Sequence, residues 1–260
     1  MYAGLDIGSR TIKLVTFDTA VVESVIADAG VNPLERARPL IAGKNFKRLV
    51  VTGYGRHLVA PVLKGDKVTE IKAFAAGAHH LLRDCRTVID IGGQDSKVIR
   101  LAENGGVLKF EMNDRCAAGT GRFLEIMAHT LEVSIGEVGD LALRARKELR
   151  INSLCTVFAE SEVVSLIARG EDSSDIALAL HEAIAARITT MVNRVGLNGK
   201  VVFAGGASLN KCLVKLLTEK LNTKLVIPDA PQIIGALGAA ILAKDGRDTN
   251  NPQEVEPGYQ

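Results

Sequence analysis

The chain has 260 residues, of which 47% are hydrophobic and 24% charged, and its formal net charge is +2. This is the composition of a globular protein that can bury one large core or two modest ones. Lysine and arginine are scattered among aspartate and glutamate, so no basic stripe indicates a nucleic-acid partner. No signal-like start and no apolar run near the roughly 20 residues of a membrane span are present. We expect a cytoplasmic protein that binds neither nucleic acid nor membrane.

A short sequence motif near the start of the chain is repeated about 84 residues later. The segments "DIGSRTIKLV" at 6–15 and "DIGGQDSKVI" at 90–99 align without a gap and share Asp-Ile-Gly and a lysine seven positions after the aspartate. In both copies an apolar, β-rich stretch runs into the turn and a second strand begins near the lysine. A further strand, "VVESVIA" or "GVLKFEM", extends each copy. We therefore predict a duplicated α/β chain built on two β-hairpin units.

Helices are predicted between and after these units. Residues 32–46, "NPLERARPLIAGKNF", allow one short helix, and helical periodicity marks 123–131 and 171–195. A third strand and turn, "KVVFAGGASLN" at 200–210, leads into a helix that carries Cys212. The segment "PQIIGALGAAILAKD" predicts a last helix, and the polar tail from 247 to 260 is expected to be loose.

The chemistry of the Asp-Ile-Gly turns suits a nucleotide. Glycines directly after a strand let backbone N–H groups approach an anion, and a carboxylate beside them can hold the hydrated Mg²⁺ of a polyphosphate. One copy alone would be read as a plain hairpin turn. The duplication, and the third glycine-rich strand end "AGGASLN" at 204–210, favour a nucleotide site.

At these motifs the chain resembles the acetate kinase, sugar kinase, heat-shock-70 and actin superfamily. The resemblance implies an α/β fold of two duplicated lobes with the nucleotide in the cleft between them, the lobes spanning 1–85 and 86–246. It implies ATP or ADP and Mg²⁺, with phosphate loops in the two turns and an adenosine-side loop after the third strand. The residues expected to bind the nucleotide are Asp6, Gly8, Ser9, Arg10, Thr11, Lys13, Asp90, Gly92, Gly93, Gly205, Gly206 and Asn210.

Two cysteines precede predicted helices. Cys116 lies in "NDRCAAGTGRF" and Cys155 in "NSLCTVFAESEV". A helix N-terminus favours anions and lowers the pKa of a thiol placed there, so both positions suit thiolates. The residues alone leave three interpretations open: a redox couple, half of a metal site, or two unrelated cysteines. Cys85 and Cys212 lie outside these motifs and are expected to be structural.

The order of the motifs "GLDIGS", "VVTGYGR", "VIDIGGQDSKV", the two cysteine segments, "GGASLN" and "PQIIGALGAA" resembles the activator proteins of 2-hydroxyacyl-CoA dehydratases. That family includes the ATP-hydrolysing subunits of benzoyl-CoA reductase, and the resemblance covers nearly the whole chain. It implies a homodimer with one [4Fe–4S] cluster between the subunits, held by Cys116 and Cys155 of each chain. Two thiolates per chain, doubled by a twofold axis, match the four that a cubane needs.

The function implied is that of an ATP-driven, one-electron donor. The cluster would receive an electron from ferredoxin or flavodoxin and pass it to an iron–sulfur dehydratase or reductase, and a cluster at a dimer seam should be destroyed easily by air. Gln94 or Asp95 would orient the attacking water, while Asp6 and Asp90 would hold Mg²⁺ through waters. The coupling requires ATP to bind two conformations with different affinity.

Other interpretations stay open. The chain could be a small-molecule kinase of the same superfamily, in which the two cysteines are incidental, or a regulatory ATP-binding module without a cluster. If it is an electron donor, its partner could be a 2-hydroxyacyl-CoA dehydratase, a benzoyl-CoA-type reductase or a double-cubane cluster protein. Iron and sulfide content after purification without oxygen separates the electron donor from the kinase and the regulatory module.

Overall fold

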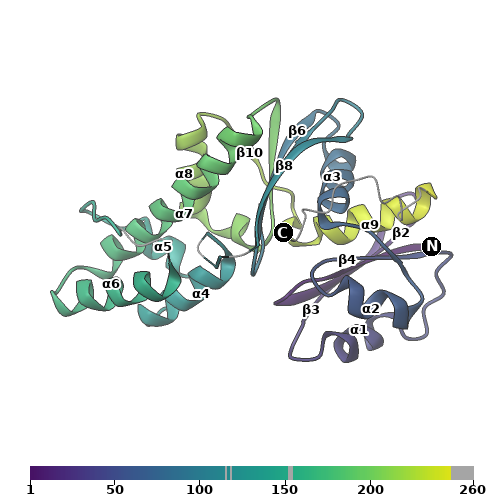
Figure 1. The fold of residues 1–260 in the computed structure, drawn as a ribbon, viewed down its shortest axis with the longest axis horizontal. Helices are drawn as coiled ribbons and strands as arrows, with labels where there is room; N and C mark the ends of the chain where they lie inside the picture. The colour runs from purple at the N-terminus through teal and green to yellow at the C-terminus, as the bar shows by residue number, and fades with distance from the viewer. Residues whose placement is uncertain (115, 118, 152–154, 247–260) are drawn as a thin grey trace, which may run out of the picture. The chain divides into compact units, whose positions relative to one another are not determined.

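The computed structural model of the chain describes residues 1–114, 116–117, 119–151 and 155–246. These residues form two compact units, whose elements are labelled in Figure 1. The first unit comprises Met1–Cys85, Leu101–Leu108 and the described chain from Gln232, and the second comprises Arg86–Arg100 and Lys109–Pro231. The predicted tail, 247–260, lies outside the described residues.

The first unit is built on a five-stranded sheet of order β3-β2-β1-β4-β5. Its strands are β1 (Tyr2–Ile7), β2 (Thr11–Phe17), β3 (Val21–Asp28), β4 (Leu49–Thr52) and β5 (Asp66–Lys67). Strand β2 is antiparallel to β1 and β3, whereas β4 is parallel to β1 and β5 is parallel to β4. Its helices are α1 (Pro33–Ile41), α2 (Arg56–Leu63), α3 (Glu70–Leu81) and α9 (Ile234–Asp245).

The second sheet repeats this arrangement. Its strands are β6 (Cys85–Ile91), β7 (Ser96–Leu101), β8 (Val107–Asn113), β9 (Lys200–Ala204) and β10 (Leu225–Val226). Their order is β10-β9-β6-β7-β8, with β6 antiparallel to β7 and β9 parallel to β10. Read in the opposite direction, as β8-β7-β6-β9-β10, these strands correspond one by one to β3-β2-β1-β4-β5 of the first sheet. The duplication predicted from two ten-residue segments is therefore a duplication of a whole sheet topology.

The second unit also carries most of the helices. They are α4 (Gly121–Thr130), α5 (Val138–Ala142), α6 (Thr156–Ala168), α7 (Ser173–Val195), the 3₁₀ turn η1 (Gly206–Leu209) and α8 (Lys211–Leu221). A second 3₁₀ turn, η2 (Pro231–Ile233), lies where the chain passes from the second unit to the first. Apolar side chains of α4, α7 and α8 pack with those of β6 and β9 in one core that contains Ile89, Leu180 and Phe203. The helices predicted at 123–131 and 171–195 are confirmed as α4 and α7. Within the described chain, no helix is both long and apolar enough to cross a membrane.

The last helix packs into the first unit through glycines. Figure 1 shows α9, at the yellow end of the chain, against α3. A Cβ on Gly238 would lie 1.7 Å from Ala73 O, and one on Gly4 would lie 2.0 Å from Ala236 O. These close backbone approaches need residues without side chains. The sequence predicted a single boundary between 85 and 86, whereas these contacts group α9 with the first unit.

Candidate functional site

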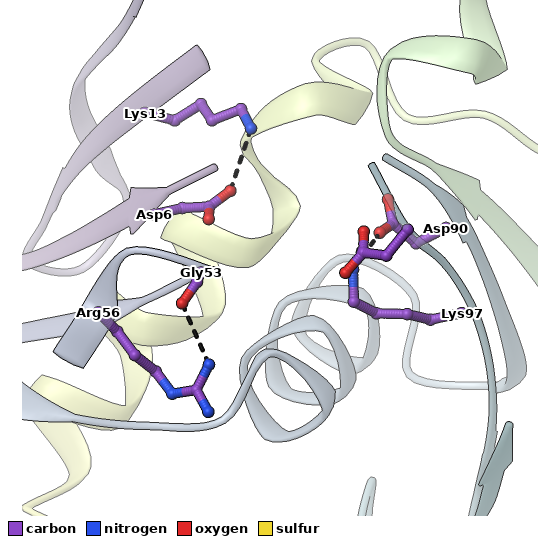
Figure 2. Close-up of polar contacts among 7 residues, drawn as sticks. Asp6, Lys13, Gly53, Arg56, Asp90 and Lys97 are labelled. Atoms are coloured by element: carbon purple, nitrogen blue, oxygen red, sulfur yellow. Dashed lines mark hydrogen bonds and ion pairs between the residues drawn. The ribbon is translucent and has the colours of Figure 1, made fainter. Parts of the chain in front are cut away.

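The first Asp-Ile-Gly turn places an aspartate and a lysine opposite each other. Asp6 in β1 and Lys13 in β2 are direct partners in the antiparallel register. Lys13 Nζ donates to Asp6 Oδ2 at 3.2 Å (Figure 2). Across the turn, Gly8 N donates to Thr11 O at 3.1 Å. The seven-residue spacing in the sequence is therefore the spacing of two facing residues in a tight hairpin.

A glycine from the neighbouring parallel strand completes this arrangement. Gly53 follows β4 with a φ of +91°, and a Cβ on it would lie 2.5 Å from Asp6 Oδ1 and 2.5 Å from Ile7 O. No other residue type fits there. Arg56 Nη1 donates to Gly53 O at 3.1 Å (Figure 2). Gly53 is not among the predicted site residues; its place after the apolar residues of "VVTGYG" is a weak hint that does not say what it contacts.

The second turn repeats the same contacts. Asp90 in β6 faces Lys97 in β7, and Lys97 Nζ donates to Asp90 Oδ2 at 3.1 Å (Figure 2). Gly92 N donates to Asp95 O at 2.9 Å, as Gly8 does to Thr11. Gly205, with a φ of +82°, takes the place of Gly53: its Cβ would lie 2.5 Å from Asp90 Oδ1. Each unit thus has an Asp-Lys-Gly cradle, by which we mean Asp6, Lys13 and Gly53, or Asp90, Lys97 and Gly205.

Electrostatics distinguish the two cradles. The side chain of Lys97 is 1% exposed and also donates to Asp95 Oδ1 at 2.8 Å, whereas that of Lys13 is 15% exposed. In the second cradle the buried ammonium of Lys97 thus pairs with the Asp90 carboxylate and also with that of Asp95 in the adjacent turn. In each cradle a carboxylate lies beside the backbone N–H groups of a turn, and the glycine leaves the space next to the carboxylate free of a Cβ. Carboxylate oxygens suit hydrated Mg²⁺ and backbone N–H groups suit phosphate, so these residues fit both.

Of the two residues predicted to orient a water, Gln94 is exposed, whereas Asp95 is half-buried and bonded to Lys97. Among the other predicted nucleotide ligands, Arg10 is exposed and Ser9 and Thr11 are half-buried in the first turn. The carbonyl groups of Gly92 and Gly93 accept hydrogen bonds from the start of α4.

The predicted adenosine-side loop follows β9. Gly205 and Gly206 lead into η1, and Asn210 is the N-cap of α8, where its Oδ1 accepts from Leu213 N at 3.0 Å. The Asn210 amide nitrogen lies 2.9 Å from His181 Nε2, and His181 Nδ1 lies 2.7 Å from Ala177 O. Because a carbonyl only accepts, Nδ1 carries the proton and Nε2 accepts from Asn210. Burial lowers the pKa of His181 below its ordinary 6.5, which agrees with this neutral tautomer.

The two candidate cysteines occupy different settings. Cys155 is exposed and is the N-cap of α6, as predicted. Cys116 is half-buried, and a turn closed by Thr120 N donating to Ala117 O separates it from α4, whose N-cap is Thr120. The prediction that Cys116 lies at a helix N-terminus is therefore wrong by one turn, and a helix dipole weakens over that distance.

Helices α4 and α6, which follow these cysteines, pack against each other. Cys85 and Cys212 are fully buried, and burial raises the pKa of Cys212 to about 12. Nowhere in the described part of the chain do three or more His, Cys, Asp or Glu side chains gather as a metal site.

Comparison with known proteins extends the likeness over nearly all of the chain. The 2-hydroxyisocaproyl-CoA dehydratase activator of Clostridioides difficile is 40% identical over 93% of this chain and 94% of its own length. Its solved structure with bound ADPNP covers 95% of both chains with a TM-score of 0.86. The structure of component A of (R)-2-hydroxyglutaryl-CoA dehydratase from Acidaminococcus fermentans is 36% identical, with a TM-score of 0.87 over 94% of this chain and 98% of that one.

A more distant relative, a benzoyl-CoA reductase subunit of Thauera aromatica, is 34% identical over 92% of this chain and 91% of its own length. The predicted fold class, the duplicated α/β fold of the acetate kinase, sugar kinase, heat-shock-70 and actin superfamily, is confirmed by the solved structures. The family description "BadF/BadG/BcrA/BcrD ATPase family" matches residues 3–243. The chain therefore belongs to the BadF/BadG/BcrA/BcrD ATPase family, the group of dehydratase activators and benzoyl-CoA reductase subunits that its motifs predict.

Proposed function

We propose that this protein hydrolyses Mg²⁺-ATP and uses the hydrolysis to drive one-electron transfer to an iron–sulfur dehydratase. The observation that carries the nucleotide part is the pair of Asp-Lys-Gly cradles, in which a Cβ at Gly53 or Gly205 would meet a carboxylate oxygen at 2.5 Å. The solved relative with bound ADPNP supports the same ligand class.

In each cradle the aspartate, Asp6 or Asp90, would hold Mg²⁺ through its water ligands. The turns that contain Gly8 and Gly92 direct backbone N–H groups to the phosphates, with Ser9, Arg10, Thr11 and Gly93 lining the same turns. Lys13, which is partly exposed, neutralises phosphate charge. Gln94 or Asp95 orients the attacking water, and this pair is the proposed catalytic set.

On the adenosine side, Gly205 and Gly206 allow the loop to approach the nucleotide. Asn210 acts by fixing this loop, because its amide oxygen caps α8 and its amide nitrogen donates to His181.

A [4Fe–4S] cluster would be held by Cys116 and Cys155 together with the same two residues of a second copy. Each chain offers two thiols that are at least partly accessible and that precede helices packed on each other. Two thiols are half of what a cubane needs, so this donor set fits a cluster shared by a homodimer. Val157 and Phe158, which follow Cys155 by two and three residues and are each 67% exposed, would be covered by the partner copy. The bound cluster supplies a single electron at low potential.

The partner follows from the relatives. Two of them act as 2-hydroxyacyl-CoA dehydratase activators or components by their names, so a dehydratase is the proposed electron acceptor. The benzoyl-CoA reductase subunit among the relatives favours a reductase as the second candidate. Ferredoxin or flavodoxin is proposed as the electron donor.

The decisive experiment is to purify the protein without oxygen and measure iron, sulfide and Mg²⁺-ATP hydrolysis. We expect about four irons per dimer, a brown colour and hydrolysis. A colourless, iron-free ATPase would contradict the electron-transfer proposal and favour a kinase or a regulatory module.

Single cysteine variants test the ligands. Cys116→Ala and Cys155→Ala should each reduce iron to near zero, because symmetry removes two of the four ligands at once. Cys85→Ala and Cys212→Ala are the matched controls, since both thiols are fully buried, and both variants should keep their iron. Iron retained in the Cys116 variant would mean that the ligands are wrongly assigned.

A further inference from the structure

The second Asp-Ile-Gly turn is hydrogen-bonded to the start of α4. Gly121 N donates to Gly92 O at 2.8 Å, and Arg122 N donates to Gly93 O at 2.8 Å. The first N–H groups of an α-helix have no partner inside the helix, and here the turn supplies partners for two of them. The turn proposed to hold phosphate and the first turn of α4 therefore form one hydrogen-bonded assembly.

The absence of a side chain at Gly121 permits this contact. A Cβ there would lie 3.1 Å from Gly92 O, which is tighter than ordinary van der Waals contact, and 3.4 Å from Gly93 Cα, which is at its lower limit. The backbone of Gly121 is not in the left-handed region, so conformational freedom does not explain the glycine. Glycine is also the poorest helix former after proline. The remaining explanation is the close approach to the turn.

The start of α4 is also hydrogen-bonded to Cys116 and Ala117, which we call the Cys116 segment, through Ala117. Thr120 N donates to Ala117 O at 3.0 Å. Asn113 Nδ2 donates to Cys116 O at 2.9 Å, and Asn113 Oδ1 accepts from Arg187 Nη2 at 3.2 Å. The Cys116 segment is thus held between the end of β8 and the start of α4, and a shift of α4 would be passed to it.

We infer that Gly121 is a positioning residue that couples the second phosphate turn to the Cys116 segment. The inference rests on the proposed function and adds the route by which nucleotide state reaches the proposed cluster ligand. When phosphate binding changes the orientation of the Gly92 and Gly93 peptide groups, the carbonyls that accept from Gly121 and Arg122 move the first turn of α4. A physical contact between the two elements can carry such coupling, and the hydrogen bonds from Gly121 N and Arg122 N to the turn supply that contact.

The test is amide hydrogen exchange on the full chain, purified without oxygen, with and without Mg²⁺-ADPNP. The amides to follow are those of Cys116, Ala117 and Gly121–Glu125. We expect nucleotide to change their exchange at least about fivefold, the lower end of ordinary coupling between sites. In Gly121→Ala this change should be lost while Mg²⁺-ADPNP still binds. Gly136→Ala is the matched control, because a Cβ there meets only Ser134 Oγ, at 3.9 Å.

A second pair of variants guards against misfolding of Gly121→Ala. Arg122→Pro removes the N–H that donates to Gly93 O at a helix position that tolerates proline, and Arg122→Ala keeps this N–H. Arg122→Pro should lose the response and Arg122→Ala should retain it.

The inference and the proposed function fail differently. A wild-type protein that binds Mg²⁺-ADPNP without a change at these amides, or a Gly121→Ala protein that responds like wild type, overturns the inference and leaves the ATPase proposal standing. A wild-type protein that does not bind Mg²⁺-ADPNP removes both.

Discussion

The two Asp-Lys-Gly cradles share their geometry but hold their lysines differently. Lys13 pairs with the Asp6 carboxylate, whereas Lys97 pairs with the carboxylates of both Asp90 and Asp95. The position of Asp95 in the second copy is taken by Thr11 in the first, since both lie five residues after the aspartate. One substitution between the copies thus changes how many carboxylates surround the lysine.

This difference separates two roles for the same motif. A lysine that is partly exposed and has one carboxylate partner can move from that carboxylate to an incoming phosphate. An ammonium that is 1% exposed is costly to bury, and two carboxylates stabilise it in place. We therefore expect Lys13 to contribute to nucleotide binding and Lys97 to hold the second cradle together.

The largest effects should come from the glycines, where the cradles are alike. Gly53→Ala and Gly205→Ala would each place a Cβ 2.5 Å from a carboxylate oxygen at a positive φ, and we expect each to cost about 4 kcal/mol of unfolding free energy or more. Urea unfolding measures this cost. Gly136→Ala, with its nearest neighbour at 3.9 Å, should cost little. If Gly205→Ala keeps the wild-type unfolding free energy, the second cradle can accommodate a Cβ at this position, and the expected steric clash with Asp90 is wrong.

The lysines should then separate the cradles. Lys97→Met leaves two carboxylates without their buried cation, so unfolding free energy should fall by about 3–5 kcal/mol. Lys13→Met should cost less, about 1–3 kcal/mol, because it removes the cation from a single buried carboxylate, Asp6, and the lysine itself is 15% exposed. Lys13→Met should instead weaken Mg²⁺-ADPNP binding, measured by calorimetry. Equal losses of stability would refute the division of roles.

Removing the lysine and one carboxylate together sharpens the same point. The double variant Lys97→Met, Asp95→Asn leaves a single carboxylate in the cradle, so it should recover part of the stability lost in Lys97→Met. The urea unfolding of the two single variants and the double variant gives the coupling energy between the two side chains. A coupling energy near zero would mean that the 2.8 Å contact contributes nothing.

The aspartates should affect hydrolysis without affecting the cluster. Asp6→Asn and Asp90→Asn retain the shape of the side chain but lose the charge proposed to act on Mg²⁺, so kcat should fall about 100-fold in each. Iron content, measured in the same preparations, should stay unchanged. If Asp6→Asn alone is inactive, the metal is held mainly by the first cradle; iron loss with unchanged hydrolysis would contradict the assignment of both.

The smallest effect concerns pH, and it should appear in the second unit. Because burial lowers the pKa of His181 below 6.5, protons bind the unfolded chain more readily than the folded one. Its stabilising contribution is complete above about pH 6.5 and decreases as pH falls, by at most about 1.4 kcal/mol per pH unit. Unfolding between pH 7.5 and 5.5 should show this slope, and His181→Gln, whose amide oxygen can still accept from Asn210, should reduce it. An unchanged slope would exclude His181 as its source.

Much of the fold and part of the site could be predicted from local patterns. Apolar alternation and helical periodicity predict β1, β2, β6, β7, α4 and α7, since each pattern reflects which face of an element is buried. The facing of Asp6 and Lys13 follows from a spacing of seven across a tight hairpin. Gly53 could not be assigned in this way, because its need to be glycine arises from β1, which lies beside β4 through parallel pairing of distant segments.

The sequence by itself determined the duplication, the two hairpin units with Asp6 and Asp90 at their turns, the helices at 123–131 and 171–195, and the family. Only the tertiary structure decided that α9 packs with α3 in the first unit, that Asp95 joins Lys97 and that Gly121 lies against Gly92. The physical reason is the separation in sequence between the residues that interact: periodicity and hairpin spacing depend on residues that are close together along the chain. Close contacts between distant backbones depend on which surfaces the packed core brings together, and a glycine in the sequence does not state which carbonyl it will meet.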